Sequence, residues 1–348
     1  MIFGECRPKR RLWDGAMPMN TVPSLRLAPM DNERSAGRRV AVIGAGFSGT
    51  MVAIHLHALL PPACQVLLCE RDRFACGTAY ATPTLWAAIQ YLGPREEAPA
   101  HRHTQTAFRF VVEGEGVWTN VEGDPVAMTR GDLLLTPGMH FHEHHNTSDH
   151  PMAWIDGLDI PLVRTIDAGF FEFGPDEPAT RETPDRSRNE RLWAHPGLAP
   201  VGAPAAKASP LMAYRWEHTD AALAAQLELE AEGHPGVVEP GHAAVRFTNP
   251  ATAGDCLSTM RCEMHRLRAG TRTATTRTAG SAVWQVFDGG GVGTVGKEHW
   301  KVGKGDLFAV ASWAPVAITA SAESGLDAFR FSDEPVFEAL GLARKEIR

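Results

Sequence analysis

After an N-terminal tail, the chain has one continuous apolar stretch, followed by two regions of short alternating segments. Residues 40–69 contain no Asp, Glu, Lys or Arg. Within them, a β-branched run at 40–43 predicts a strand, the apolar stretch up to Leu60 predicts a helix, and 65–69 predict a second strand. Such a length would cross a bilayer, but histidines, a proline pair and spaced glycines interrupt it. We therefore expect a buried strand–helix–strand unit and no membrane segment.

From Pro83 onward the chain consists of short alternating segments separated by Gly, Pro and Asp, a pattern typical of antiparallel barrels. Residues 171–214 are rich in Pro and Arg and predict a long connection. Thr219 or Asp220 should cap the helix that follows, and Gly233 should end it. The strand pattern then resumes and continues almost to the C-terminus.

These patterns predict a mainly β fold with two barrels, preceded by a partial Rossmann-like βαβ unit. The expected division is a tail (1–37), the partial βαβ unit (38–83), a first barrel (84–170), a connection with one helix (171–242), a second barrel (243–335) and a second tail (336–348).

The two barrel regions resemble each other, which indicates an internal duplication. Gly114 follows a His-x-His motif at the same interval at which Gly289 follows a Thr-x-Thr motif, and Gly131-Asp matches Gly305-Asp further on. Glycine is the residue that readily takes the positive φ of a tight corner, so preserved glycines predict preserved turns. We expect two barrels of one design.

Composition narrows the class of protein. The 348 residues include 34 Lys and Arg against 41 Asp and Glu, a net charge of −7, which argues against a nucleic-acid-binding protein. Six cysteines form no CxxC pair, which favours a reducing compartment, and we expect a cytoplasmic protein.

Histidines are concentrated in the first barrel region, and they are the candidate chemistry of the chain. His101 and His103 are two residues apart and share one face of a strand, as do His140, His142 and His144 on a later strand. Two such strands inside a small barrel can place three imidazoles around one point and leave positions open for substrate and O2. The sequence predicts a metal site here, with solvated or core histidines as the alternative.

Several segments resemble a known family. The His-x-His pair and the run Gly-x5-Pro-Gly-x3-His-x3-Asn over residues 131–146 resemble the cupin superfamily. Four longer segments are similar to the gentisate 1,2-dioxygenase family and to its relatives that act on salicylate and 1-hydroxy-2-naphthoate: Trp86–Gln90, Ala98–His103, Phe108–Phe110 and Trp154–Pro161. The resemblance extends from about residue 84 to the C-terminus.

This resemblance implies two cupin barrels with Fe(II) in the first. It also implies cleavage of gentisate by O2 to maleylpyruvate, between the carboxyl-bearing and hydroxyl-bearing ring carbons. The expected partners are a small aromatic substrate of the 2-hydroxybenzoate type and O2, and the expected assembly is a homo-tetramer. Salicylate and 1-hydroxy-2-naphthoate are alternative substrates.

The cupin pattern also selects the metal ligands. Alternation alone cannot choose the third histidine, but the pattern has Asn four residues after the ligand, and Asn146 selects His142. The implied ligands are His101, His103 and His142, and Ala107 occupies the place of the usual cupin glutamate. Zinc also accepts three histidines, so the preference for iron comes from the resemblance.

Five further residues are expected at the substrate. Arg109 should pair with its carboxylate through the guanidinium fork, the alternative being an ordinary surface arginine. Gln90 and His144 should bond the ring hydroxyls, and Asp156 should orient His144. Trp86 should pack on the ring, or else be an ordinary core tryptophan.

The second barrel region lacks these ligands. Thr276, Thr278 and Val316 occupy the positions of the three histidines and cannot replace imidazoles in a ferrous site. We therefore expect one metal ion per chain and a structural or interface role for the second barrel.

The N-terminal region differs from the family pattern. Gly44-x-Gly46-x-x-Gly49 lies between a predicted strand and helix, with Glu70 after the next strand, and this segment resembles FAD/NAD(P)-binding proteins. No third parallel strand is predicted before Pro83, so we expect no bound nucleotide. A flavin or nicotinamide oxidoreductase is one alternative. Because the segment replaces an arm that helps close the family's pocket, a catalytically impaired metal-binding fusion protein is another.

Overall fold

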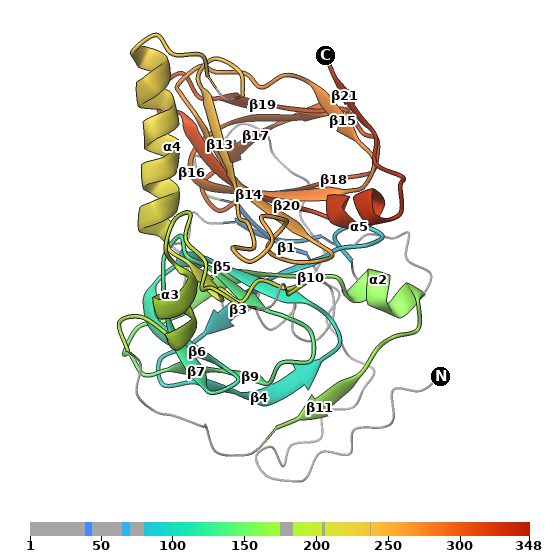
Figure 1. The fold of residues 1–348 in the computed structure, drawn as a ribbon. Helices are drawn as coiled ribbons and strands as arrows, with labels where there is room; N and C mark the ends of the chain where they lie inside the picture. Colours follow the sequence, from blue (N-terminus) through green and yellow to red (C-terminus); the bar gives the residue numbers. More distant parts are fainter. Residues whose placement is uncertain (1–38, 44–64, 70–79, 175–183, 204–205, 237) are drawn as a thin grey trace, which may run out of the picture. The chain divides into compact units, whose positions relative to one another are not determined.

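The computed structural model describes residues 39–43, 65–69, 80–174, 184–203, 206–236 and 238–348 (Figure 1). The expected N-terminal tail, the glycine fingerprint and the helix of the βαβ unit lie outside these residues. The unit's two strands, β1 (Arg39–Ile43) and β2 (Gln65–Cys69), pair in parallel. The rest of the described chain is mainly β, which confirms that part of the predicted fold class.

The first barrel consists of two five-stranded sheets, in the orders β12-β8-β5-β10-β3 and β11-β4-β9-β6-β7. Its elements are β3 (Trp86–Leu92), β4 (Glu97–His103), β5 (Ala107–Glu113), β6 (Glu115–Val121), β7 (Asp124–Thr129), β8 (Leu133–Thr136), β9 (His142–Asn146), β10 (Met152–Leu158), α2 (Ile160–Thr165) and β11 (Phe171–Phe173), with β12 (Ala213–Tyr214) added from the connection.

The second barrel has the order β13-β14-β20-β16-β19-β15-β21, and the long strand β16 also pairs with β17 and β18. Its elements are β13 (His242–Arg246), β14 (Arg261–Leu267), β15 (Thr276–Thr278), β16 (Ala282–Val295), β17 (Glu298–Gly303), β18 (Leu307–Val310), β19 (Val316–Ala320), β20 (Leu326–Ser332), α5 (Glu334–Ala339) and β21 (Lys345–Ile347).

Strand register confirms the internal duplication. His101 lies opposite His142 in the first barrel, and Thr276 lies opposite Val316 in the second. The glycine corners match as well, because Gly114, Gly131, Gly289 and Gly305 all have positive φ. At two of them a Cβ would come within 3.0 Å of backbone atoms: Gly114 faces the carbonyl of Pro151, and Gly289 faces that of Gly325.

The last residues of the chain belong to the duplicated unit. Helix α5 and strand β21 follow β20 as α2 and β11 follow β10, and β21 pairs with β15 as β11 pairs with β4. The prediction of a free tail at 336–348 is therefore wrong. Three residues of strand preceded by one short helix give too weak a pattern to recognise in isolation.

The connection between the barrels contains two helices, α3 (Arg188–Trp193) and α4 (Trp216–Ala231), where we expected one. Helix α4 also begins before Thr219, so the prediction of Thr219 or Asp220 as the N-cap is wrong. The carboxylate of Asp132, in the turn between β7 and β8, accepts a hydrogen bond from the Trp216 N–H at 2.9 Å and caps the helix from outside. Gly233 follows the helix with φ of 93°, as expected for a helix stop.

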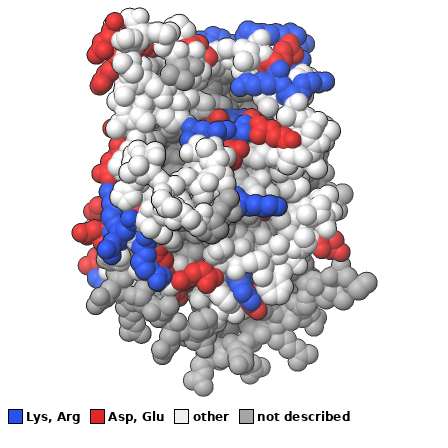
Figure 2. All heavy atoms as spheres, viewed as in Figure 1, with Lys and Arg blue, Asp and Glu red and all other residues white. Residues whose placement is uncertain are grey.

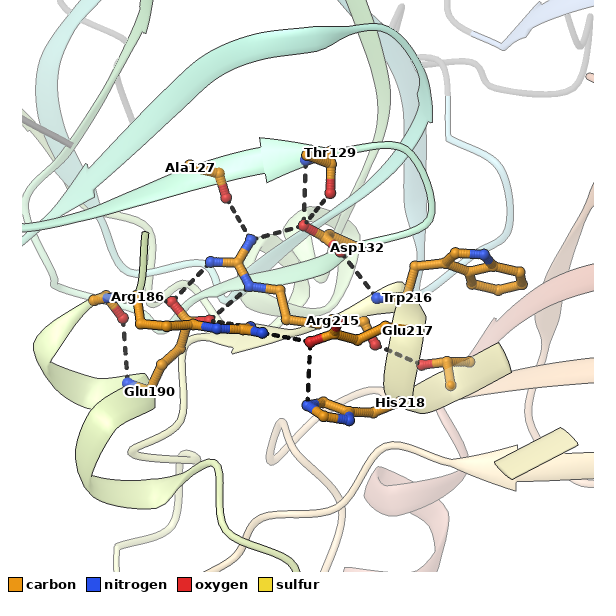
Figure 3. Close-up of polar contacts among 11 residues, drawn as sticks. Ala127, Thr129, Asp132, Arg186, Glu190, Arg215, Trp216, Glu217 and His218 are labelled. Carbon is orange, nitrogen blue, oxygen red and sulfur yellow. Dashed lines mark hydrogen bonds and ion pairs between the residues drawn. The ribbon is translucent and has the colours of Figure 1, made fainter. Parts of the chain in front are cut away.

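Arg215 anchors the start of α4 to the first barrel (Figure 3). Its guanidinium donates to both carboxylate oxygens of Glu190, at 2.6 and 2.7 Å, and to Asp132 at 2.7 Å. It also donates to the carbonyl of Ala127. The Glu190 and Asp132 side chains are each 1% exposed, so this cation neutralises two buried anions at once.

The two barrels share an aromatic core. Phe108 and Phe110 on β5 pack against Phe329 and Phe331 on β20, and the rings of Phe110 and Phe329 stack at 4.1 Å. All four rings are buried, and burial of such side chains is worth about 1.5–3 kcal/mol each. Strand alternation leaves the intervening Arg109 and Arg330 on the opposite faces, toward the two barrel interiors.

No helix within the described residues is long and apolar enough to cross a membrane. On the face drawn in Figure 2, acidic and basic side chains of the described residues are intermingled and form no continuous basic area. This distribution agrees with the negative net charge.

Replacing Arg215 by Ala should lower the free energy of unfolding by about 3–5 kcal/mol, because Asp132 would remain as a buried charge without its cation and Glu190 would keep only its 3.3 Å contact with Arg186. Denaturant unfolding followed by circular dichroism measures the loss. The control is Arg95→Ala, which breaks an exposed ion pair with Asp149 and should cost less than about 1 kcal/mol. Equal losses in the two variants would contradict the anchoring role.

Candidate metal centre

The structure brings His101, His103 and His142 together at one point of the first barrel. The first two lie on β4 and the third on the adjacent strand β9. One nitrogen from each ring lies within 4.8 Å of the others, and the ring centroids are 4.3–5.6 Å apart. Within the described residues, this is the group of His, Cys, Asp or Glu side chains close enough to hold one metal ion.

Backbone carbonyls fix the orientation of all three rings. The Nδ1 atoms of His101, His103 and His142 lie 2.8, 2.8 and 3.0 Å from the carbonyls of Pro99, Gln105 and His140, respectively. A carbonyl can only accept, so each Nδ1 carries the proton and each Nε2 presents a lone pair. The Nε2 atom of His142 is buried and has no hydrogen-bond partner, so its lone pair is available to a metal ion.

The surroundings keep these imidazoles neutral. Burial lowers the pKa of His101, and it lowers that of His103 to about 4, with the charge of Arg109 adding to both effects. Burial and Arg109 also hold the pKa of His142 well below its ordinary value. Neutral rings bind a metal without first losing a proton. Ala107, at the position of the usual cupin glutamate, is buried and supplies no anionic ligand.

The structure separates the three histidines that alternation alone could not distinguish. His140 precedes β9, and its Nδ1 lies 3.1 Å from the carbonyl of Gly138. The ring of His144 is 6.0 Å from that of His142 and is buried, with an unpartnered Nε2. His142 is the member of this set that joins His101 and His103.

Arg109 lies inside the barrel. Its side chain on β5 is 4% exposed, so the alternative of a surface arginine is excluded. The guanidinium donates to the hydroxyl of Thr136, its Nε lies 3.5 Å from a carboxylate oxygen of Asp156, and this Nε has no hydrogen-bond partner. The structure thus places a partly unsatisfied cation close enough to His142 to influence its pKa.

Asp156 has a different neighbour from the one expected. It accepts a hydrogen bond from the indole of Trp154 at 3.1 Å and faces Arg109, and the pair to His144 is not formed. Burial raises the pKa of Asp156 to about 6, although Arg109 and Trp154 oppose the shift. The partner of His144 is Thr119 on β6, whose hydroxyl lies 2.8 Å from its Nδ1. We did not predict Thr119, because a threonine in a strand carries no signal of its own.

The remaining predicted side chains lie on β3. Trp86 and Gln90 alternate with buried Ala87 and Ile89 and occupy the half-buried face of this strand. In the sheet, β3 is separated from β5 by β10. One strand, β10, therefore lies between these two residues and Arg109.

Phe171 on β11 is a neighbour of the site that the sequence analysis missed. Strand β11 pairs with β4, and the ring of Phe171 stacks on that of His101 at 5.5 Å. It lies in a segment expected to be a connection, where an isolated aromatic residue gives no indication of its contacts. The second barrel has Thr276, Thr278 and Val316 at the positions of the three histidines, as expected.

Replacing His142 by Ala should abolish stoichiometric iron binding, because two nitrogens remain where three are needed. The measurement is metal analysis after anaerobic loading with Fe(II) and desalting. The control is His140→Ala, which removes a neighbouring histidine that is not one of the three ligands. This variant should keep about one iron per chain. Equal iron loss in the two variants would contradict the ligand set.

Two family models match the chain. A cupin domain model matches residues 88–160, within the first barrel. A model described as FAD dependent oxidoreductase matches residues 39–119, which confirms the expected resemblance of the N-terminal segment. Where the two overlap, the structure has strands of the first barrel.

Similar proteins agree with the cupin match. A gentisate 1,2-dioxygenase from Streptomyces sp is 71% identical over 268 residues, which cover 77% of this chain and 74% of that protein. A 5-aminosalicylate 1,2-dioxygenase from Comamonas sp is 36% identical over 77% of this chain and 71% of its own. The crystal structure of a salicylate 1,2-dioxygenase from Pseudoaminobacter salicylatoxidans, an adduct with gentisate, superposes with a TM-score of 0.78 at 54% identity, covering 86% of this chain and 82% of that one.

The predicted resemblance is thereby confirmed over the barrels and at the N-terminal segment. The chain belongs to the gentisate 1,2-dioxygenase family.

Proposed function

We propose that this protein is an Fe(II)-dependent dioxygenase that cleaves the aromatic ring of gentisate with O2 to give maleylpyruvate. The observation that carries the proposal is the convergence of three neutral histidines beside a buried arginine. Iron is preferred to zinc because the related proteins are dioxygenases.

The donor set fits a ferrous ion. His101, His103 and His142 would hold it through their Nε2 atoms, since each Nδ1 is already engaged by a carbonyl. When bound, Fe(II) supplies a reduced centre with open positions where an aromatic substrate and O2 can meet. Three neutral ligands leave the positive charge of the ion uncompensated, which favours an anionic substrate.

Arg109 supplies the second cation for such a substrate. Its guanidinium is desolvated, held by Thr136 and Asp156, and has an unpartnered Nε. In a water-poor site an arginine pairs strongly with a carboxylate, so Arg109 would bind and orient the carboxyl group of gentisate. Asp156, whose carboxylate lies 3.5 Å from the Nε, would position Arg109.

The ring hydroxyls would be bound by neutral groups. His144 has its Nδ1 held by Thr119 and keeps an unpartnered Nε2 within the barrel, where it can hydrogen-bond a hydroxyl. Gln90 would bond a ring hydroxyl, and Trp86 would pack on the ring. The buried residues around His142 and His144 would keep water away from the aromatic ring of the substrate during the reaction.

Gentisate is the substrate named for the Streptomyces relative, and the salicylate dioxygenase structure contains it as an adduct. Salicylate and 1-hydroxy-2-naphthoate share the adjacent carboxyl and hydroxyl groups and are the alternative substrates. A catalytically impaired metal-binding fusion protein is the alternative outside enzymes.

We assign different roles to the two copies of the barrel. The first barrel, extended by β11 and β12, would carry the reaction, and the second, which continues to β21, would bind no metal. The N-terminal unit, residues 38–83, would remain a partial Rossmann-like fragment without a nucleotide. The assembly proposed from the resemblance is a homo-tetramer.

Protein loaded anaerobically with Fe(II) and then mixed with gentisate in air should consume O2 and form maleylpyruvate in equal amounts. An oxygen electrode and the absorbance of the product follow the two together. Stoichiometric iron without O2 uptake would favour the impaired fusion protein, and preferential turnover of salicylate would change the substrate assignment.

Replacing Arg109 by Gln should lower kcat/KM for gentisate at least about 30-fold, because a buried, charge-assisted contact with the substrate is worth 2 kcal/mol or more. Arg109→Lys keeps the charge but loses the fork, and about a tenfold decrease is expected. Steady-state kinetics with iron content matched to wild type give the comparison. Arg95→Lys serves as a surface control, and a wild-type kcat/KM in Arg109→Gln would overturn the assigned role.

A further inference from the structure

The second barrel contains a cavity of its own, with a volume of about 220 Å³. His265 of β14, Trp284 of β16 and Arg330 of β20 are among the residues that line it. An engineered cavity of about 150 Å³ is known to hold benzene, so this space suits a molecule with a single substituted ring.

The cavity lies at the duplicate of the proposed active site. A register shift occurs at Trp154 and Val111 in the first barrel and at Ala328 and Val286 in the second, which aligns the strands of the two repeats. This register makes six lining residues the counterparts of residues predicted for the first site. Thr276, Thr278 and Val316 correspond to the three histidines. Trp284 corresponds to Arg109, Arg330 to Asp156 and His265 to Gln90. The second barrel therefore has a cavity at the position that corresponds to the metal centre, but its lining residues have a different chemistry.

The two arginines of this pocket are paired within the protein, and the third cation of the lining, Lys345, is exposed. Arg330 is buried and donates to the carboxylates of Glu263 and Glu334. Burial opposes the ionisation of Glu263, but Arg330 and His265 outweigh it and hold its pKa below the usual range. Arg261, also in the lining, donates to Glu334 and Asp255 at 2.9 Å. Neither arginine is left with an uncompensated charge for an anionic ligand.

Two polar side-chain atoms in the lining make no hydrogen bond within the described residues. Trp284 is 7% exposed, and its indole N–H donates to no group within the described residues. The Nδ1 of His265 lies 3.0 Å from the Nε2 of His242, while the Nε2 of His265 is buried, makes no hydrogen bond and lies 3.8 Å from a carboxylate oxygen of Glu263. Since buried polar groups are nearly always hydrogen-bonded, these two atoms call for a partner inside the cavity.

Another part of the lining is apolar. Val310, Val316 and Ile318 line the cavity and belong to, or pack against, the hydrophobic core of the second barrel. A ligand that satisfies both parts has an apolar body and a hydroxyl group, because a hydroxyl can accept from the indole N–H and donate to an imidazole nitrogen.

We propose that the second barrel binds a small neutral phenol in this cavity, with its ring on the apolar wall and its hydroxyl toward Trp284 and His265. The site needs no metal, since its described residues include no cluster with the ligand geometry of the first barrel. It is separate from the proposed ring cleavage and concerns binding alone.

The test is a fluorine NMR titration of the whole protein, without added metal, using 4-fluorophenol as the probe. Wild-type protein should bind it saturably, and Trp284→Phe, which keeps the ring and removes the N–H, should bind about fivefold more weakly. The matched control is Trp118→Phe in the first barrel, which removes another buried, unpartnered indole N–H and should leave the affinity unchanged. Ala314→Leu fills part of the cavity and should reduce binding further.

Three results would overturn the proposal: no saturable binding, equal affinity in wild type, Trp284→Phe and Ala314→Leu, or tighter binding of 4-fluorobenzoate than of 4-fluorophenol at this site. The third result would show that the pocket selects an anion. Thermal unfolding of each variant identifies loss of folding as a cause, and in that event Ala314→Leu alone decides the outcome. Because the readout is binding, its result does not depend on whether the protein turns over gentisate.

Discussion

The structure depends on one constraint, namely that successive side chains of strands β5 and β20 point to opposite faces of their sheets. In β5 the sequence Phe-Arg-Phe at 108–110 sends its two rings into the core between the barrels and its arginine into the first barrel. In β20 the same triplet at 329–331 sends its rings to that core and its arginine into the second barrel. Since side chains alternate at every residue, the aromatic contact that joins the barrels also fixes a cation in each pocket.

The metal centre of the first barrel is built from few residues. Two adjacent strands provide the three rings, and carbonyls two residues away from each ring determine which nitrogen is protonated. No carboxylate takes part, because Ala107 occupies the position where one is usual. The resulting site combines neutral donors with the nearby charge of Arg109, and this arrangement agrees with a substrate that brings its own negative charge.

The sequence predicted those features that depend on local spacing. The His101–His103 pair and the alternation of β9 are each visible within a few residues of sequence, and the glycine corners revealed the duplication because positive φ restricts the residue type. The sequence did not predict features that depend on distant partners. Helix α4 begins at Trp216 because Asp132, far away in the chain, caps it. Likewise, Thr119 holds His144, and Asp156 turns to Arg109, because the sheet order brings those strands together.

The most direct test of the account is a crystal structure of the Fe(II)-loaded protein with anomalous diffraction recorded at the iron edge. The account predicts one iron peak per chain, surrounded by the Nε2 atoms of His101, His103 and His142, and no peak in the second barrel. An iron peak at any other position, or three histidine rings turned away from an empty centre, would contradict it.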